Sequence, residues 1–321
     1  MVDSLVTTGN ETNPPLYYLL AWPWARVLGD GPVALRSLSA IAGTATVAVG
    51  YLAGRELVSV RVGRVVAALA AVSPLLVWFS QEARAYALLS LLSALSLLFF
   101  ARSLRDAGAL RWWALASCLA LLTHYFALFL VAVEAAWLLV SRRERAWRPL
   151  AAVAGTTALL VPLGLSQRAE GGTSWITTVP LVDRLRGSVN GFLSGPSEGL
   201  ELVGAVLLAL ALAGLGLAFW RGTEEERRGA RTALLAGALP LLVTVACAVA
   251  GMDLINGRNL IVVWLPLAVA VATGFGARRA GTLGRAAGAA FCLVSIGVVI
   301  AVAISEELQR EPSPPIAPGT R

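Results

Sequence analysis

The sequence predicts an all-α integral membrane protein, a polytopic helical bundle of about ten spans, and three observations support this fold class. Hydrophobic residues make up 57% of the 321 residues and charged residues only 14%, whereas a soluble domain carries about 25% charged residues. The mean hydropathy is +0.74. Most apolar runs have the length of about 17–25 residues that crosses the hydrocarbon layer of a membrane.

The ten expected spans follow one another along the chain with short polar connections. They are residues 33–54, 65–79, 86–104, 112–124, 126–140, 149–166, 199–220, 230–251, 259–276 and 286–304. The fourth and fifth are short, and they predict either a bent hairpin that stops inside the membrane or one long helix. We expect one transmembrane domain over residues 1–304, followed by a disordered, proline-rich extracytoplasmic tail over residues 305–321.

The basic residues give this bundle a direction. The net charge of +7 and the pI of about 10.1 would indicate nucleic-acid binding in a soluble protein, but here the arginines separate apolar runs, so no nucleic-acid partner is expected. Basic residues concentrate in the short cytoplasmic loops of membrane proteins. The arginines of alternate loops therefore predict a multi-pass protein of the cell membrane with both termini extracytoplasmic; they are Arg55, Arg61, Arg64, Arg102, Arg105, Arg111, Arg142, Arg143, Arg145, Arg148, Arg221, Arg227, Arg228, Arg231, Arg278, Arg279 and Arg285.

Three segments are expected on the outer face: two short polar segments and one long connection. Residues 1–32 are too polar to span the membrane but have to lie outside it, so we expect that an upstream helix is missing, through a misplaced start codon or a truncated gene. The turn at residues 80–86 is the second polar segment. In the long connection over residues 167–198, glycine and proline indicate turns rather than a folded domain.

The first polar string runs from Asn13 to Tyr18 and reads Asn-Pro-Pro-Leu-Tyr-Tyr. Its two prolines favour an extended backbone, which would hold Glu11 and Asn13 at a set position above the membrane. The alternative is the start of a helix at a proline, with Tyr17 and Tyr18 at the membrane interface. Taken alone, this string fits the alternative better.

The second string runs from Ser80 to Tyr86 and reads Ser-Gln-Glu-Ala-Arg-Ala-Tyr. A turn this short between two spans rarely needs Gln81, Glu82, Arg84 and Tyr86 together, so a functional role is favoured over a solvated turn with a weak surface ion pair. Arg84 suits a phosphate group, because the planar guanidinium donates two hydrogen bonds at once.

Three further polar residues lie in or beside apolar runs. His124 is the only histidine and, with Tyr125, lies near the outer face, where either a hydrogen-bonded interfacial histidine or a metal or substrate contact is open. Arg258 lies at the outer boundary of a span, as a snorkelling anchor or as a second phosphate-binding arginine. Glu134 falls inside a span, and we expect a structural polar contact there.

Several strings together resemble glycosyltransferase family 39, which includes the protein O-mannosyltransferases and the aminoarabinose transferase of lipid A. The resemblance covers residues 11–140 well and residues 250–275 loosely. It rests on Asn13 to Tyr18, Ala34 to Ser39, Tyr51 to Arg55, Ser73-Pro74, Ser80 to Tyr86, Thr123 to Tyr125, and Arg258 to Leu260 followed by Pro266.

This resemblance implies an architecture of the GT-C type, with the active site on the extracytoplasmic face. It implies a glycosyltransferase that moves a sugar, with inversion, from a polyprenyl-phosphate donor to a glycan, lipid or protein acceptor. An acidic residue would act as general base on the acceptor hydroxyl, and fixed cations would stabilise the departing lipid phosphate. Membrane lipid and the lipid-linked sugar are then the expected partners.

The implied roles fall on the residues singled out above. Arg84, Arg258 and Tyr86 are expected to bind the donor phosphate; the expected substrate contacts are Asn13, Tyr17, Gln81, His124 and Tyr125. The family carries its acidic motif upstream of the proline pair, so the general-base Asp is expected before Met1, and Glu11 and Glu82 are the candidates within this chain. No cofactor is certain, and a divalent metal at His124 stays open.

Two other functions compete with transfer. A lipid or sugar flippase or transporter would place its charges near the midplane, in helices broken by glycine and proline, whereas the polar strings here lie at one face. A truncated homologue without catalytic activity is the other alternative. The sequence specifies neither the sugar, the acceptor nor the oligomeric state.

Overall fold

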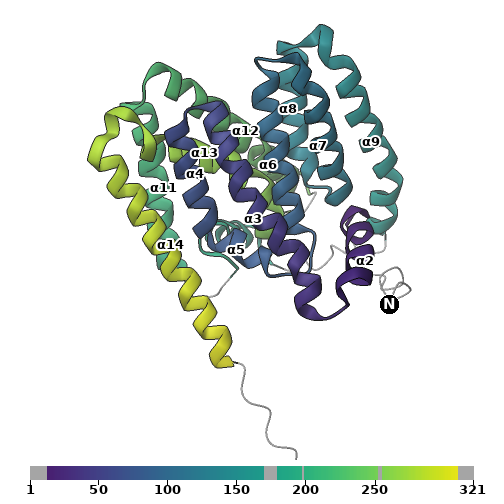
Figure 1. The fold of residues 1–321 in the computed structure, drawn as a ribbon, viewed down its shortest axis with the longest axis horizontal. Helices are drawn as coiled ribbons and strands as arrows, with labels where there is room; N and C mark the ends of the chain where they lie inside the picture. Colours follow the sequence, from purple (N-terminus) through teal and green to yellow (C-terminus); the bar gives the residue numbers. More distant parts are fainter. Residues whose placement is uncertain (1–12, 170–178, 197–198, 252–254, 310–321) are drawn as a thin grey trace, which may run out of the picture.

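The computed structural model describes residues 13–169, 179–196, 199–251 and 255–309, and within these ranges the chain is helical, with no strand. Figure 1 shows a bundle whose long helices run roughly side by side. The predicted all-α fold class is confirmed.

Every predicted span corresponds to a helix. The long apolar helices are α3 (Pro32–Leu57), α6 (Tyr86–Ser103), α9 (Arg143–Ala169), α11 (Glu201–Arg221), α12 (Glu224–Val249) and α14 (Gly281–Gln309), with α13 (Trp264–Gly276) continuing the 3-10 helix η3 (Gly257–Val263). By length and composition, seven helical segments of the described chain can cross a membrane, or eight if one bent pair counts as a single span.

The bent pair consists of α4 (Val60–Val72) and α5 (Pro74–Ser80), whose axes differ by 57°. Ser73 separates them because a residue that precedes proline is disfavoured in the helical conformation. Its side chain then accepts a hydrogen bond from the backbone N–H of Leu76 at 3.4 Å and caps α5. The short helix α5 thereby turns away from α4 and carries the string at residues 80–86 at its end.

The fourth and fifth predicted spans form a hairpin, and the alternative of one long helix is wrong. After the 3-10 turn η1 (Ala107–Ala109), α7 (Leu110–Thr123) descends and α8 (Ala127–Ser141) returns. At 1.5 Å per residue each helix is about 22 Å long, shorter than the about 30 Å hydrocarbon layer. A guanidinium N–H of Arg142, at the end of α8, donates to the backbone oxygen of Leu104, at the end of α6, and joins these two helix ends.

The core lies between α6, α13 and the helices around them, and α6 and α13 are the most buried spans. Glu134 on α8 is fully buried there. It accepts hydrogen bonds from the hydroxyl of Ser96 and, at 2.8 Å, from the indole N–H of Trp113. Glu134 therefore makes the structural polar contact that its sequence position predicts.

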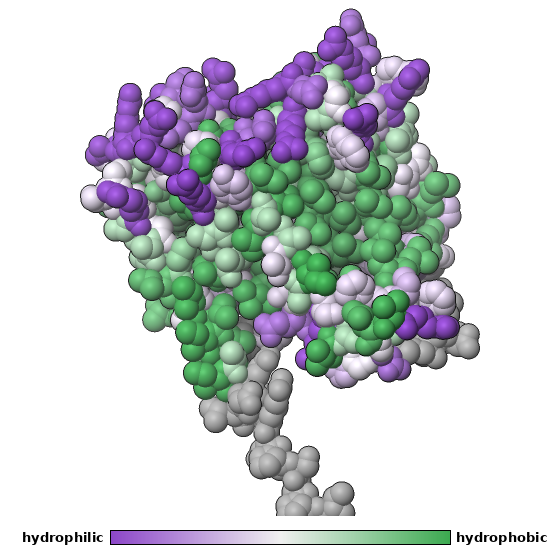
Figure 2. Space-filling model, viewed as in Figure 1, coloured by the Kyte–Doolittle hydropathy of each residue, from purple (hydrophilic) through white to green (hydrophobic). Residues whose placement is uncertain are grey.

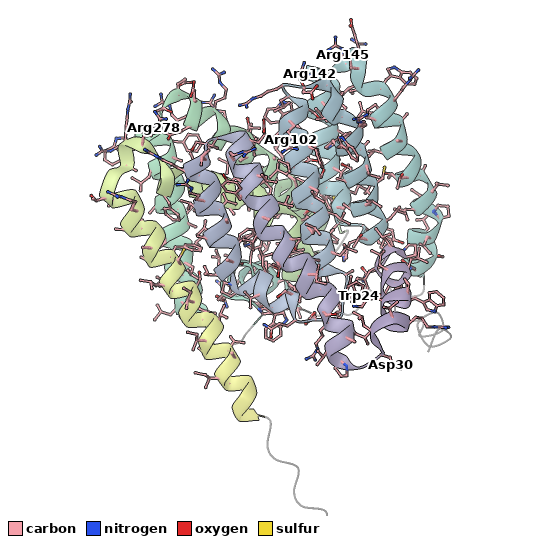
Figure 3. The ribbon with its side chains drawn as sticks, in the orientation of Figure 1. Trp24, Asp30, Arg102, Arg142, Arg145 and Arg278 are labelled. Atoms are coloured by element: carbon pink, nitrogen blue, oxygen red, sulfur yellow. The ribbon has the colours of Figure 1, made fainter. Side chains whose placement is uncertain are left out.

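Arginines gather at one end of the bundle. Figure 3 places Arg102, Arg142, Arg145 and Arg278 at the upper end, and Trp24 and Asp30 at the opposite end. Figure 2 shows the same polarity on the visible face, with hydrophilic side chains above a broad hydrophobic band. We call the upper end, where the loops before α4, α7, α9, α12 and α14 lie, the arginine-rich end.

Two further helices lie in the predicted outer segments: the first decides between the two interpretations of the first string, and the second corrects the expectation of turns. The helix α2 (Leu16–Leu28) starts directly after Pro15, as in the alternative interpretation of the first string, and the indole of Trp24 donates to the backbone oxygen of Ala34 at 3.0 Å. The helix α10 (Leu181–Ser194) occupies part of the connection in which turns were expected. The last helix, α14, continues to Gln309, past the predicted boundary of the tail; the rest of the tail lies outside the described residues.

Candidate functional site

A cavity of about 440 Å³ lies among α5, the turn that follows it, α10 and the start of η3. The helix α5 lies at the lower end in Figure 1, which is the end that Figure 3 marks with Trp24 and Asp30, opposite the arginine-rich end. The residues that line the cavity are Leu75, Trp78, Phe79, Glu82, Arg84, Val179, Arg184, Gly187, Ser188, Gly191, Pro196, Asn256, Gly257 and Arg258. Three elements that are distant in the chain thus build one site.

Glu82 supplies the carboxylate of the cavity. The indole N–H of Trp78, four residues earlier at the end of α5, donates to Glu82 Oε1 at 3.0 Å. The second oxygen, Oε2, is buried and has no hydrogen-bond partner in the described part of the chain. One carboxylate oxygen is therefore fixed by the protein, and the other is available to accept a hydrogen bond or a proton.

Arg84 lies two residues farther along the same turn, and its position is held through the backbone. The hydroxyl of Ser39 on α3 donates to the backbone oxygen of Arg84 at 3.4 Å. Ser39 also forms a side-chain hydrogen bond with the buried Tyr17 of α2. The two polar strings are thus joined through Ser39, while the guanidinium of Arg84 stays in an exposed position at the cavity.

Arg258 enters the cavity from the other side of the site. Asn256 caps η3 by accepting the backbone N–H of Arg258 at 3.4 Å. The guanidinium carbon of Arg258 lies 6.0 Å from the centre of the Tyr86 ring, a distance at which a cation is attracted to an aromatic face. The ring centre of Tyr86 lies 4.7 Å from that of Phe79 and 5.7 Å from that of His124. Arg258 therefore lies against a packed group of aromatic side chains.

His124 belongs to this aromatic group and is 5% exposed. Its Nδ1 accepts the backbone N–H of Phe126 at 3.2 Å, so the neutral ring carries its proton on Nε2. In the four described ranges no group of three or more His, Cys, Asp or Glu side chains could hold a metal ion, so a metal at His124 would need ligands from elsewhere.

The other predicted substrate contacts lie apart from the lining of this cavity. The side-chain amide of Gln81 donates to the backbone oxygen of Val77 at 3.3 Å, and the hydroxyl of Tyr125 donates to Gln167 on α9 at 2.8 Å. Asn13 is half-buried just before α2. Glu11 lies outside the described residues. The substrate roles of Asn13, Tyr17, Gln81 and Tyr125 stay predictions.

Sequence reasoning missed the contribution of α10, which brings Arg184, Gly187, Ser188 and Gly191 to the cavity. The signal that could have found the helix was its start and its pattern: Pro180 precedes it, Asp183 lies in its first turn, and apolar residues recur on one side of it. Trp78 was also missed as the partner of Glu82.

The comparisons with known proteins agree with this architecture. Residues 12–164, slightly less than half of the chain, match the family described as dolichyl-phosphate-mannose-protein mannosyltransferase. A search of the curated proteins found no significant match.

Among solved structures, the fold is similar to that of ArnT from Cupriavidus metallidurans, both in the apo state and bound to undecaprenyl phosphate. The TM-score is 0.55 in each case, the identities are 15% and 13%, and the alignment covers 94% of this chain. The chain spans 56% of the length of ArnT. The chain therefore shares the fold of ArnT, and residues 12–164 match the mannosyltransferase family model, in line with the resemblance seen in the sequence.

Proposed function

We propose that this protein transfers a sugar from a polyprenyl-phosphate carrier to a hydroxyl acceptor, with inversion at the sugar C1, and that the reaction occurs in the cavity at the extracytoplasmic end of the bundle. The observation that carries the proposal is the composition of the cavity wall. Glu82, Arg84, Arg184 and Arg258, from three separate elements, line one space.

The charges of the cavity suit the leaving group. As the bond between C1 and the phosphate oxygen breaks, its electron pair goes to that oxygen, and the carrier phosphate gains negative charge. Arginines placed beforehand around that oxygen stabilise the developing charge more than they stabilise the ground state, which lowers the barrier. Arg84 and Arg258 are assigned to this phosphate, with Tyr86 supporting Arg258.

Glu82 is the candidate general base within the described chain. The acceptor oxygen forms the new bond to C1, and its proton passes to a carboxylate oxygen; no electrons are exchanged with a redox partner. Glu82 Oε2 has the geometry for this step because Oε1 is already held by Trp78 and Oε2 is without a partner among the described residues. A general base within reach of the proton typically contributes 10²–10⁴-fold to the rate.

The nature of the carrier draws on a relative. One of the two similar ArnT structures is bound to undecaprenyl phosphate. A polyprenyl phosphate suits this chain as well, because a cavity with three arginines at the end of an apolar bundle can hold a phosphate in the headgroup region while the prenyl chain stays in lipid.

Transfer by purified protein tests the proposal. The full chain is reconstituted in liposomes with radiolabelled polyprenyl-phosphate sugars and a panel of lipid, glycan and peptide acceptors, and labelled product is measured. We expect wild-type transfer, and a loss of about 100-fold in Arg84→Ala because one charge-stabilising donor is removed. The controls Arg61→Ala and Arg143→Ala, both exposed at the arginine-rich end, are expected to keep wild-type turnover.

The same samples separate the competing functions. Movement of the labelled lipid between leaflets without any transfer would support a flippase. Neither movement nor transfer, with the protein folded and inserted, would support a homologue without catalytic activity. Near-normal transfer by Arg84→Ala would contradict the phosphate role of Arg84.

A further inference from the structure

We propose that one face of α10 is the sugar-binding wall of the cavity and that Gly187 and Gly191 set the size of the sugar that the protein accepts. The inference rests on the proposed function, since it divides the same cavity into a phosphate part and a sugar part. It assigns specificity to a helix that the polar strings of the sequence do not include.

The lining residues of α10 lie on one side of the helix. Arg184, Gly187, Ser188 and Gly191 all line the cavity, and their spacing of three to four residues places them on one helical face. Arg184 is at the start of this face and carries its only charge. Beyond Arg184, the wall consists of glycine backbone and one small hydroxyl side chain.

The two glycines are not explained by close packing. A Cβ added at Gly187 or at Gly191 would meet no atom within 4 Å. Elsewhere in the bundle glycines do permit close approach: a Cβ at Gly274 would lie 1.7 Å from the backbone oxygen of Gly214. A helical glycine costs about 1 kcal/mol relative to alanine. At Gly187 and Gly191 the missing side chains leave open space inside the cavity that both residues line.

The wall is held firmly enough to discriminate by size. Ser188 is 4% exposed, and its backbone lies beside Gly257 of η3, where an added Cβ would be 3.3 Å from the Ser188 Cα. On the far side, Asn190 packs against Gly204 of α11, where an added Cβ would be 1.9 Å from the amide oxygen. The helix α10 therefore packs between η3 and α11, and these contacts keep it from moving away from a bulky ligand.

The charges decide which part of the donor lies here. Arg84 and Arg258 are assigned to the phosphate, while Gly187, Ser188 and Gly191 offer a neutral surface. A sugar fits such a surface, because it needs shape complementarity and hydrogen bonds rather than a countercharge. The indole of Trp78 lines the same space and offers apolar ring surface for the sugar carbons.

Binding measurements on the purified full chain in detergent test this wall. The first probe is undecaprenyl phosphate. The second is a sugar-bearing lipid: a panel of undecaprenyl-phosphate hexoses and pentoses is screened, and the lipid that wild type binds best is used. In Gly187→Leu and Gly191→Leu we expect affinity for undecaprenyl phosphate within about twofold of wild type and a loss of at least about tenfold for the sugar-bearing lipid. Tenfold corresponds to about 1.4 kcal/mol, the scale of a steric conflict within a pocket.

Three further variants keep the test decisive. Val189→Leu changes the same helix on a residue that is 47% exposed and absent from the cavity lining, so both affinities should stay at the wild-type value. Gly187→Ala and Gly191→Ala favour the helix, so these variants fold even if the leucine variants do not. They should still lower the affinity for the sugar-bearing lipid by at least about threefold. Their affinity for undecaprenyl phosphate should stay unchanged.

Each other result overturns the inference. Equal losses for both probes would make α10 a general support of the site, and no loss for either would leave the sugar elsewhere. If the wild-type protein binds undecaprenyl phosphate but shows no preference among its sugar derivatives, the sugar wall is contradicted, while the assignment of the carrier stands. If wild type binds neither probe, the proposed function fails first.

Discussion

Arg84 and Arg258 reach one cavity from opposite parts of the chain, and this meeting could be predicted only in part. The alternation of arginine-rich loops placed both residues at the same end of the bundle, and the guanidinium chemistry indicated phosphate. Their adjacency depends on the break at Ser73, which turns α5 and its following turn toward η3. A bend of this kind depends on tertiary packing, which no pattern of single residues specifies.

His124 gives a residue-scale prediction about stability. Its ring lies beside the rings of Tyr86 and Phe126, with ring centres 5.7 Å apart in both cases. The variant His124→Gln changes this packing. The melting temperature of the detergent-purified variant should therefore be lower than that of wild type. An unchanged melting temperature would show that the histidine ring does not support this group of side chains.

At the scale of elements, the long spans were predicted well, the start of α2 was predicted only as an alternative, and α10 was missed. The spans carry their signal in length and hydropathy alone. The helix α2 has 13 residues with Pro23 inside it, and its apolar character was diluted by the polar residues that precede it. The helix α10 was hidden by Gly187 and Gly191, which are poor helix formers and whose presence relates to the cavity rather than to local folding.

The contact between α3 and α5 yields an element-scale prediction. A Cβ at Gly43 would lie 2.7 Å from the Cβ of Ser80, the last residue of α5. Gly43→Ala should therefore push α5 and the turn that bears Glu82 away from α3. Overpacking costs about 1–3 kcal/mol, partly offset by about 1 kcal/mol of helix propensity, so we expect a lower melting temperature and weaker binding of undecaprenyl phosphate.

Gly216→Ala on α11 is the control for this change. An added Cβ at Gly216 meets nothing within 4 Å, so only the gain in helix propensity applies, and stability should stay level or rise while binding stays unchanged. If both alanine variants behave alike, the approach of α3 to α5 does not position the site.

At the scale of the whole molecule, the arginine distribution predicted which loops share an end. Exposed tryptophans beside arginines occur at both ends. At the arginine-rich end Trp112, Trp147 and Trp220 each lie 4.2–5.3 Å, from ring centre to guanidinium carbon, from a neighbouring arginine. At the other end Trp22 lies 4.8 Å from Arg26 in the same measure. Tryptophan and arginine together are typical of a membrane–water interface. The direction in which the bundle faces across the membrane stays a prediction from the loop charges.

Cysteine labelling in intact cells tests this direction. In a variant in which Cys118, Cys247 and Cys292 are replaced by alanine, a single cysteine is introduced by Asp30→Cys or by Arg145→Cys; both positions are exposed, and they lie at opposite ends. We expect a membrane-impermeant maleimide to label the Asp30→Cys protein in intact cells and the Arg145→Cys protein only after permeabilisation. The reverse pattern would place the cavity on the cytoplasmic side.

The most direct test of the central claim is the affinity of the purified full chain for undecaprenyl phosphate. We expect saturable binding by wild type and by Arg143→Ala, and a loss of at least about tenfold in Arg84→Ala and in Arg258→Ala, because each removes a charge-assisted hydrogen bond of about 1.5–3 kcal/mol. Wild-type affinity in both cavity variants, with unchanged melting temperatures, would contradict the assignment of this cavity to the lipid phosphate.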